Sequence, residues 1–293
     1  MYDIKNYVEA TSVAEATALL AQNPELRIIA GGTDVLIKMQ HGSLVAAELL
    51  SIRSISALTN ITMAEDGIIR IGALASFTLV HQNKLVEANL MALREAALSM
   101  GGPQIRNVAT IGGNICNGVT SADSAPILFA LDAVLKLENA SGSRLVPITE
   151  FYRGPGQVAL APDEMLTEIQ IEPASYVGCG SHYIKFAMRN AMDIATLGVA
   201  VVCRVKDGCF DQVRIGLGVA GPTPLRCLEA EAYAVGQPVN QATIGQIGQL
   251  ALNSTRARTS WRASKEYREH LVTELTQRAL KVAIVRAGGA ELA

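Results

Sequence analysis

The stretch "LRIIAGGTDVL" (residues 26–36) places two glycines directly after a short apolar run. A second pair, Gly112-Gly113, follows another apolar run in "NVATIGGNICNGVTSAD" (residues 107–123). Glycine allows positive φ angles and lets backbone N–H groups approach a ligand closely, so each pair suits a loop that holds a diphosphate. Nearby hydroxyl and amide side chains (Thr33, Thr110 and Asn114) would add further donors. Each pair alone is also compatible with a plain tight turn, and the residues leave both interpretations open.

The segments around the two glycine pairs predict alternating helices and strands. Ser12 and Glu15 form a capping box that begins a helix, and Asn23-Pro24 ends it. Ser124, with Pro126 in the first turn, marks another helix start. The further predicted elements are a buried strand over 26–30, a strand and bend over 67–77, a helix over 86–102, a strand over 106–114, a hairpin over 133–148 and a strand over 165–173.

The composition loosens around residues 172–181, and we expect a domain boundary there. Beyond it, apolar segments over 182–189, 196–205 and 212–221 predict neighbouring antiparallel strands, and Asp207-Gly208 predicts a tight turn between two of them. The chain is expected to end in a helix stopped by Gly288-Gly289. Its apolar face would combine Tyr267, Leu271, Leu275 and Val282.

The sequence "GLGVAG" (residues 216–221) fits the pattern G-x-G-x-x-G of dinucleotide-binding folds. That pattern must open a helix, whose amino terminus holds the pyrophosphate. Pro222 and Pro224 follow at once and prevent a continuous helix. We therefore interpret these glycines as part of a tightly packed strand and turn.

Composition excludes several classes of protein. The chain has 293 residues, of which 49% are apolar, enough for one large domain or two ordinary ones. A net charge of -2 and a single tryptophan argue against a nucleic-acid-binding surface. The start "MYDIKNYVEA" lacks the features of a signal peptide, and no apolar run is long enough to span a bilayer. We therefore expect a cytoplasmic protein.

The cysteines and histidines do not form a metal-binding pattern. Five cysteines and four histidines are scattered along the chain without a C-x-x-C pair. Close-spaced zinc and iron–sulfur signatures are therefore missing, and we expect no metal site on this chain.

The order of these motifs resembles that of the FAD-binding subunits of molybdenum hydroxylases, the family of xanthine dehydrogenases, aldehyde oxidoreductases and aerobic carbon monoxide dehydrogenases. The resemblance rests on "AGGTDVL" followed at this distance by "GPQIRNVATIGGNICNGVTSADSAP". It continues through "DEMLTEIQIEP", "HYIKFAMRNAMDIATLGVAVVCRV" and "SWRASKEYREHL", and so covers essentially the whole chain. Within the family, the chain most resembles the flavin subunits of three-subunit bacterial xanthine dehydrogenases.

The resemblance implies an α+β fold. Residues 1–176 would form an FAD-binding domain of the vanillyl-alcohol-oxidase type, with subdomains over about 1–55 and 56–176. Residues 177–293 would form the smaller carboxy-terminal flavoprotein-subunit domain, with a three-stranded antiparallel sheet and helices.

The same resemblance implies the cofactor contacts. The two glycine segments correspond to FAD loops, Asp123 to a flavin-nucleotide contact, Leu166 to a contact of the isoalloxazine and Lys185 to a lysine beside the ring. A cation there would stabilise reduced flavin. Plainer roles stay open: Asp123 as a helix cap, Leu166 as an ordinary strand residue and Lys185 as a solvated one. The expected FAD contacts are Arg27, Ile28, Ile29, Ala30, Gly31, Gly32, Thr33, Asp34, Val35, Leu36, Ala109, Thr110, Ile111, Gly112, Gly113, Asn114, Asp123, Leu166 and Lys185.

The implied function is electron transfer, with no catalytic acid, base or nucleophile on this chain. Substrate would be hydroxylated at a molybdenum cofactor on a large partner subunit. Electrons would pass through 2Fe-2S clusters on a small partner subunit to FAD, and then to NAD or another acceptor. The expected complex is a xanthine dehydrogenase, and an aldehyde, N-heterocycle or carbon monoxide oxidoreductase is the alternative. A stand-alone flavin oxidoreductase and a non-catalytic nucleotide-binding scaffold are competing hypotheses.

Overall fold

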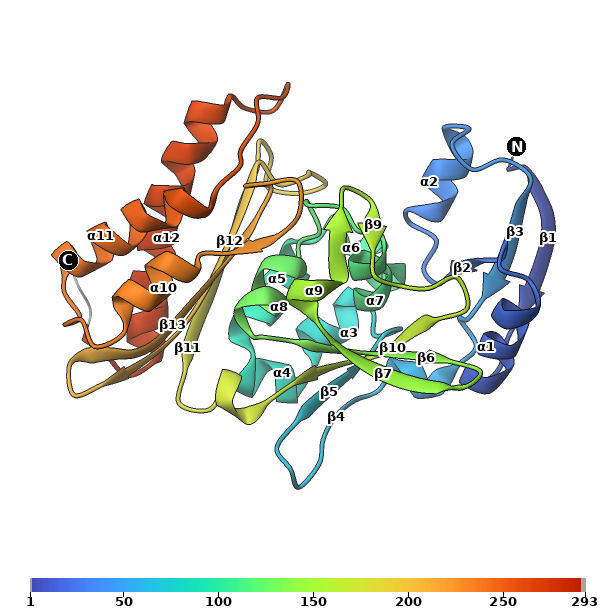
Figure 1. Ribbon diagram of the computed structural model, residues 1–293, viewed down its shortest axis with the longest axis horizontal. Helices are drawn as coiled ribbons and strands as arrows, with labels where there is room; N and C mark the ends of the chain where they lie inside the picture. Colours follow the sequence, from blue (N-terminus) through green and yellow to red (C-terminus); the bar gives the residue numbers. More distant parts are fainter. Residues whose placement is uncertain (1, 291–293) are drawn as a thin grey trace.

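The computed structural model describes residues 2–290, which form three main sheets arranged along one long axis (Figure 1). The amino-terminal sheet is parallel, in the order β1 (Ile4–Glu9), β3 (Ala47–Ser51), β2 (Arg27–Ile29). The helices of this unit are α1 (Val13–Gln22) and α2 (Val35–Gln40). No helix within residues 2–290 has the length and apolarity needed to cross a membrane.

The first helix begins as its capping signal predicts. The Glu15 N–H donates to Ser12 Oγ at 3.1 Å, and the Glu15 carboxylate accepts from the Thr11 N–H at 2.8 Å. The segment over 26–30 contains the predicted strand, but the prediction that this strand is buried is wrong. That strand, β2, is three residues long and half-exposed, because it lies at the edge of the sheet.

The central unit is a five-stranded antiparallel sheet that packs with several short helices. The predicted hairpin around Ser141-Gly142 is confirmed, since its two strands pair through Asn139 and Gly142. The sheet order is β4 (Ile61–Met63), β5 (Ile69–Gly72), β10 (Met165–Ile171), β6 (Val134–Asn139), β7 (Gly142–Pro147). The other elements are η1 (Ser56–Thr59), α3 (Phe77–Gln82), α4 (Lys84–Asn89), α5 (Met91–Ser99), α6 (Pro103–Val108), α7 (Ile111–Cys116), α8 (Ala125–Ala130), α9 (Ile148–Phe151), the ribbon of β8 (Tyr152–Gly154) and β9 (Gln157–Val158), and η2 (Pro173–Ser175).

The strand predicted over 106–114 is wrong, because this segment is helical. α6 has Pro103 in its first turn, and α7 begins after Thr110, whose hydroxyl accepts from the Gly113 N–H at 3.1 Å. Proline in the first turn and threonine at the cap are helix-start signals, and they outweigh the apolar alternation. Gly112 and Gly113 therefore lie in the first turn of a helix. The helix predicted over 86–102 is divided into α4 and α5, which meet at Leu90.

The carboxy-terminal unit is a four-stranded antiparallel sheet packed with helices. The expected three-stranded sheet is wrong by one short strand, because the sheet has four. The chain turns back after Gly221, and β14 pairs with Gly216 and Leu217 of β13. Asp207 and Gly208 both have positive φ, as the predicted tight turn requires. The elements are β11 (Gly180–Phe186), β12 (Leu197–Lys206), β13 (Cys209–Gly218), β14 (Leu225–Arg226), α10 (Leu228–Ala234), α11 (Gln241–Ala251), η3 (Leu252–Ser254) and α12 (Lys265–Arg286).

The last helix buries Leu271 and Leu275 as predicted. Tyr267 is exposed and Val282 is half-buried, so these two residues flank the buried face instead of belonging to it.

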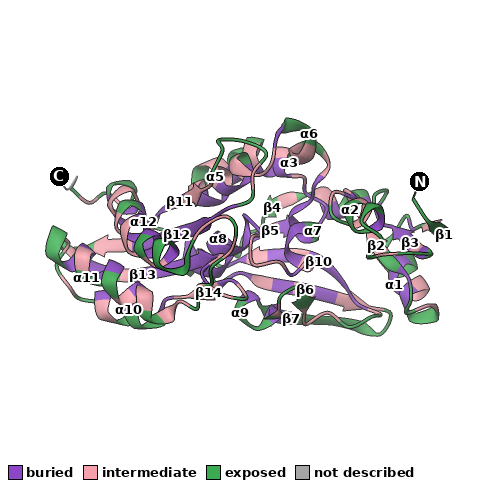
Figure 2. Cartoon of the chain, turned by 90° about the horizontal axis from the view of Figure 1, so that it is seen from above, coloured by how far each residue is buried: buried purple, intermediate pink, exposed green. Residues whose placement is uncertain are grey.

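Both faces of the carboxy-terminal sheet are covered. Val199, Val201 and Cys203 of β12 point into the core shared with α10–α12, whereas Ala200 and Val202 pack into the core of the central unit. Figure 2 shows the buried residues continuing from β12 and β13 into α8. The continuous apolar run of β12 follows from this double burial. The central and carboxy-terminal units therefore pack directly against each other.

The G-x-G-x-x-G match lies in and after β13, as the tight-packing interpretation predicts. A Cβ on Gly216 would stand 1.9 Å from the Pro126 carbonyl oxygen, and one on Gly218 would stand 2.9 Å from the Pro126 ring. These glycines let α8 approach the sheet at backbone distance.

One carboxylate joins α5, β11 and α12. Glu95 lies 2.9 Å from His182 Nδ1, accepts from the Tyr183 N–H at 2.9 Å and pairs with Arg286 at 2.7 Å. Burial alone would raise the pKa of Glu95, but these three contacts outweigh burial and lower that pKa from its usual 4.5.

We expect Glu95→Gln to destabilise the protein by about 1–3 kcal/mol at neutral pH. A carboxyl whose folded pKa is lowered stabilises the fold above its unfolded pKa and loses that contribution as pH falls through the folded pKa. The gap between the urea midpoints of variant and wild type should therefore shrink below about pH 4. Glu65→Gln, at an exposed site, is the control. A gap that stays constant into acid would contradict this assignment.

Candidate functional site

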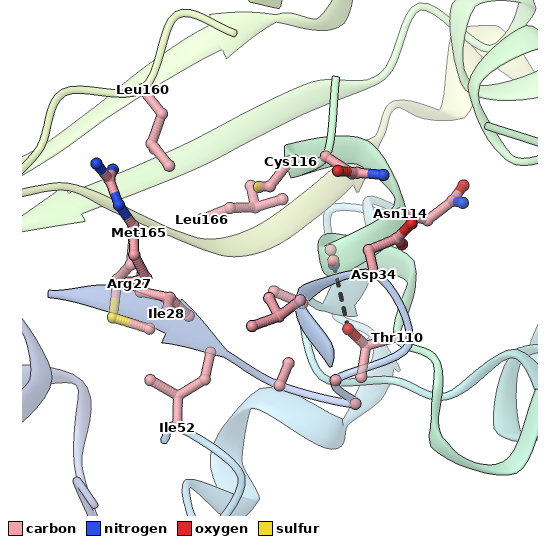
Figure 3. A pocket seen from close by; sticks show the side chains of 18 of the residues that line it. Arg27, Ile28, Asp34, Ile52, Thr110, Asn114, Cys116, Leu160, Met165 and Leu166 are labelled. Carbon is pink, nitrogen blue, oxygen red and sulfur yellow. Dashed lines mark hydrogen bonds between the residues drawn. The ribbon is translucent and has the colours of Figure 1, made fainter. Parts of the chain in front are cut away.

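A cleft of about 590 Å³ lies between the amino-terminal sheet and the central unit. Its wall is built from the β2–α2 connection, the α6–α7 junction, the start of β10 and residues 158–164. Figure 3 shows two ends of different character. Asp34, Thr110 and Asn114 lie at one end, and Ile52 and Met165 lie at the other. The cleft therefore offers a polar end beside the two glycine segments and, at the other end, apolar side chains next to the guanidinium of Arg27.

The two glycine segments touch each other in this cleft. A Cβ on Gly31 would stand 1.9 Å from the Val108 carbonyl oxygen and 3.0 Å from the Ala109 Cα. Both contacts are with backbone, which cannot swing aside as a side chain can. Gly31 is therefore required for the β2–α2 connection to lie against the α6–α7 junction.

The first glycine segment presents free backbone donors. Gly32 has φ +75°, a left-handed conformation that favours glycine. Within residues 2–290, the backbone N–H groups of Gly31, Gly32 and Thr33 have no hydrogen-bond partner. Consecutive free N–H groups around a left-handed residue form a concavity suited to an anion.

The second glycine segment is held rigidly from behind. The Gly112 N–H donates to the Ala73 carbonyl at 2.9 Å, and a Cβ on Gly112 would stand 2.6 Å from the same oxygen. Asn114 accepts from the Ser124 hydroxyl at 2.7 Å. The predicted helix start is confirmed, with Ser124 at the amino-terminal cap of α8 and Pro126 in the first turn, but the Ser124 hydroxyl fixes Asn114 and makes no capping bond. Gly113 is exposed at the cleft.

Two cations line the cleft, Arg27 and Lys38, and Arg27 lies at the end beside Met165, away from Asp34 and Asn114. Lys38 donates to Asn117 at 2.7 Å, and Glu164 is held by Arg144 through bonds of 2.6 and 2.8 Å. Burial raises the pKa of Asp34, against the effect of Lys38. Binding of an anionic ligand here would rest chiefly on backbone donors, each contributing about 1.5–3 kcal/mol to a charged acceptor.

The cleft also contains a cysteine, which the sequence leaves without a role. Burial raises the pKa of Cys116 to about 12, so this residue is a thiol at neutral pH and not a nucleophilic thiolate. Within residues 2–290, no group of three or more His, Cys, Asp and Glu side chains is placed to hold a metal ion.

Most of the expected contacts line the cleft, and a few do not. Asp123 and Lys185 do not line the cleft, and Lys185 lines a separate, smaller pocket beside Ser99. The two side chains form a buried ion pair of 2.8 Å, which excludes the plainer interpretation of Lys185 as a solvated residue. Ile29, Leu36 and Ile111 do not line the cleft either. The expected residues that do are Arg27, Ile28, Ala30, Gly31, Gly32, Thr33, Asp34, Val35, Ala109, Thr110, Gly112, Gly113, Asn114 and Leu166.

Sequence reasoning missed part of the lining. Leu20, Ile52 and Leu74 come from separate elements, and a further group precedes or begins β10: Val158, Leu160, Ala161, Pro162, Glu164 and Met165. Each has an ordinary core or loop pattern in the sequence, so no local signal marks it. Only the long-range packing of the two units brings these residues together.

Comparison with known proteins gives one consistent result. Residues 2–174 match the family described as FAD binding domain in molybdopterin dehydrogenase, and residues 182–283 match the CO dehydrogenase flavoprotein C-terminal domain. The chain is 45% identical over 289 residues to a xanthine dehydrogenase FAD-binding subunit of Escherichia coli, covering 99% of both chains. It is 31% identical over 283 residues to the carbon monoxide dehydrogenase medium chain of Afipia carboxidovorans, covering 96% of this chain and 97% of that one. A chain of the carbon monoxide dehydrogenase from Hydrogenophaga pseudoflava superimposes with a TM-score of 0.93 at 30% identity, covering 98% of this chain and 99% of that one.

Proposed function

Since the chain belongs to the FAD-binding family of the molybdopterin dehydrogenases, we propose that it is the flavin subunit of a cytoplasmic xanthine dehydrogenase complex that delivers electrons to NAD. FAD is its cofactor. The observation that carries the assignment to xanthine dehydrogenase is the 45% identity to a xanthine dehydrogenase FAD-binding subunit over nearly the full length of both chains.

The residues of the cleft fit FAD. We propose that the free N–H groups of Gly31, Gly32 and Thr33, with the exposed first turn of α7 at Gly113, hold the diphosphate. A Cβ at Gly31 would separate the two segments, so the glycines are part of the cradle. The end of the cleft around Leu166 and Met165 would take the isoalloxazine. Bound FAD would supply the two-electron carrier between the partner clusters and NAD.

We propose that Asp123 and Lys185 support the wall of the site near its polar end, since Ser124, next to Asp123, is bonded to Asn114 at 2.7 Å. Lys185 donates to the Ser99 carbonyl at 3.2 Å, and Ser99 adjoins Met100, which lines the cleft. Because Asp123 balances its charge at 2.8 Å, Lys185 would act mainly by fixing the wall. Tyr183 also contacts Asp123, at 3.3 Å.

The proposed partners are the subunits that would carry the other cofactors of such a complex. A large subunit with the molybdenum cofactor would carry out substrate hydroxylation, and a small 2Fe-2S subunit would pass electrons to this chain. The related medium chains argue for a subunit and not for a stand-alone oxidase. A carbon monoxide or aldehyde oxidoreductase is the second candidate, supported by the match to the carbon monoxide dehydrogenase chain.

NADH added without oxygen is expected to reduce the bound flavin. If NAD is the acceptor, the reverse hydride transfer should bleach the oxidised-flavin absorbance of the isolated chain, and released cofactor should have the mass of FAD. Gly245→Ala, at an open helix position away from the cleft, is the control. A flavin that bleaches with dithionite but not with NADH would remove NAD from the proposal and leave the flavin assignment intact.

A further inference from the structure

A segment without helix or strand connects η3 to α12, and its composition is unusual for this chain. Residues 255–264, "TRARTSWRAS", include three arginines and the single tryptophan of the protein. We call residues 255–264 the arginine–tryptophan segment. It is folded back on itself, since the Ser260 N–H donates to the Ala263 carbonyl at 3.0 Å.

A buried arginine attaches this segment to the carboxy-terminal sheet. Arg268, at 3% exposure, donates to Ser260 Oγ at 2.8 Å and to the Val219 carbonyl at 3.5 Å. Its Nε is buried and has no hydrogen-bond partner within residues 2–290, and the Nε of Arg262 is in the same state. A buried charged donor without a partner costs free energy. These two arginines therefore lower the stability of the isolated chain unless another molecule supplies an acceptor.

The positive charges of this region are not balanced. In the part of the chain that the structure describes, no ion pair joins a carboxylate to Arg256, Arg258, Arg262 or Arg268. Burial, together with the like charges of Arg258 and Arg262, lowers the pKa of Arg268. Negative charge from outside the chain would relieve this repulsion.

The tryptophan shows what kind of molecule fits the surface. Trp261 is 74% exposed, and the guanidinium of Arg262 lies 4.2 Å from its ring centroid. Tryptophan and arginine are the residue types that contribute most often to the energetic centres of protein interfaces. A small anion would need the arginines and would leave the indole in water, whereas a protein surface would bury both.

We propose that the arginine–tryptophan segment is a docking surface for an acidic patch on a companion subunit. The proposal rests on the proposed function, because it requires that the chain is one subunit of a complex. Carboxylates of the companion would pair with Arg256, Arg258 and Arg262, and an apolar contact would cover Trp261. Arg268 joins the segment to Val219, the residue that follows β13, so docking would act close to the carboxy-terminal sheet.

The tryptophan itself reports on binding. A poly-glutamate peptide should change the emission of Trp261 saturably at low salt, and added salt should reverse the change, because surface charges are screened. We expect Arg258→Gln with Arg262→Gln to weaken the peptide about 10-fold. Arg278→Gln changes an exposed arginine of α12, outside the segment, and should leave the affinity for the peptide unchanged. No response to the peptide, or an equal response to inorganic pyrophosphate, would overturn the proposal; the second result would indicate a small-anion site.

Assembly of the complex provides the second test. Arg258→Glu with Arg262→Glu should keep FAD but fail to co-elute with separately produced companion subunits in size-exclusion chromatography. Arg53→Glu with Arg153→Glu changes the net charge equally at two exposed positions and should assemble normally. Assembly of both double variants, or of neither, would overturn the proposal. The FAD content of each variant keeps this result separate from the flavin assignment, which would fail if the unchanged chain held no flavin.

Discussion

Gly31→Ala is expected to weaken FAD binding by about 100-fold while the chain stays folded, corresponding to about 3 kcal/mol or the loss of two hydrogen bonds to a charged group. The added Cβ would stand 1.9 Å from the Val108 carbonyl oxygen, so the β2–α2 connection must move away from the α6–α7 junction. The two sets of backbone donors would then no longer converge on one diphosphate. The measurement is flavin absorbance per protein after gel filtration, with FAD titrated back into the variant.

The control for this variant is another glycine without a neighbour. Gly245→Ala in α11 meets nothing within 4 Å and should retain full flavin. Far-ultraviolet circular dichroism should show that both variants keep their secondary structure. If Gly31→Ala holds as much FAD as wild type after gel filtration, the two segments do not form the cradle.

Gly113→Val tests the other side of the same cradle. A Cβ there meets only Thr110 Oγ1, at 2.9 Å, so the branches of valine would extend toward the open cleft. We expect loss of FAD without unfolding. Gly32→Val is a less specific test, because φ +75° strains any β-branched residue whether or not FAD binds there.

The parts of the fold that the sequence predicts are those whose causes are local. Ser12 caps α1, Asp207-Gly208 closes the turn of β12 and β13, and the hairpin at Gly142 forms where expected. The strand predicted over 106–114 is wrong because two local signals in this segment disagree. Its apolar alternation favours a strand, whereas Pro103 and Thr110 begin helices, and the packed structure decides between them.

The site is less predictable because its causes are long-range. The need for glycine at position 31 comes from Val108, which only the fold brings near. In the same way, the alternating pattern around Lys185 is compatible with a solvated side chain. No neighbouring residue in the sequence indicates that Asp123 is its partner. The resemblance to a flavoprotein family gave residue positions, but the contacts that make those residues necessary follow only from the packed units.

Asp123→Asn is expected to destabilise the protein by about 3–5 kcal/mol, because it leaves a buried ammonium without its counter-charge. The two side chains are 7% and 9% exposed and stand 2.8 Å apart. Burial raises the pKa of Asp123, and Lys185 opposes that rise. Lys185→Met should cost less than Asp123→Asn, since the remaining carboxyl can take up a proton. The measurement is the midpoint of urea unfolding for the flavin-free chain, so that cofactor loss does not enter.

The double variant Asp123→Asn with Lys185→Met separates the two roles that this pair could have. It removes both buried charges together, and replacing a whole buried ion pair is often close to neutral, so most of the lost stability should return. The flavin potential of the double variant should then stay near that of wild type, because the pair is neutral as a unit. Additive losses of stability would contradict the coupling seen at 2.8 Å. A restored fold with a clearly more negative flavin potential would instead show that the ammonium of Lys185 acts on the flavin as a charge.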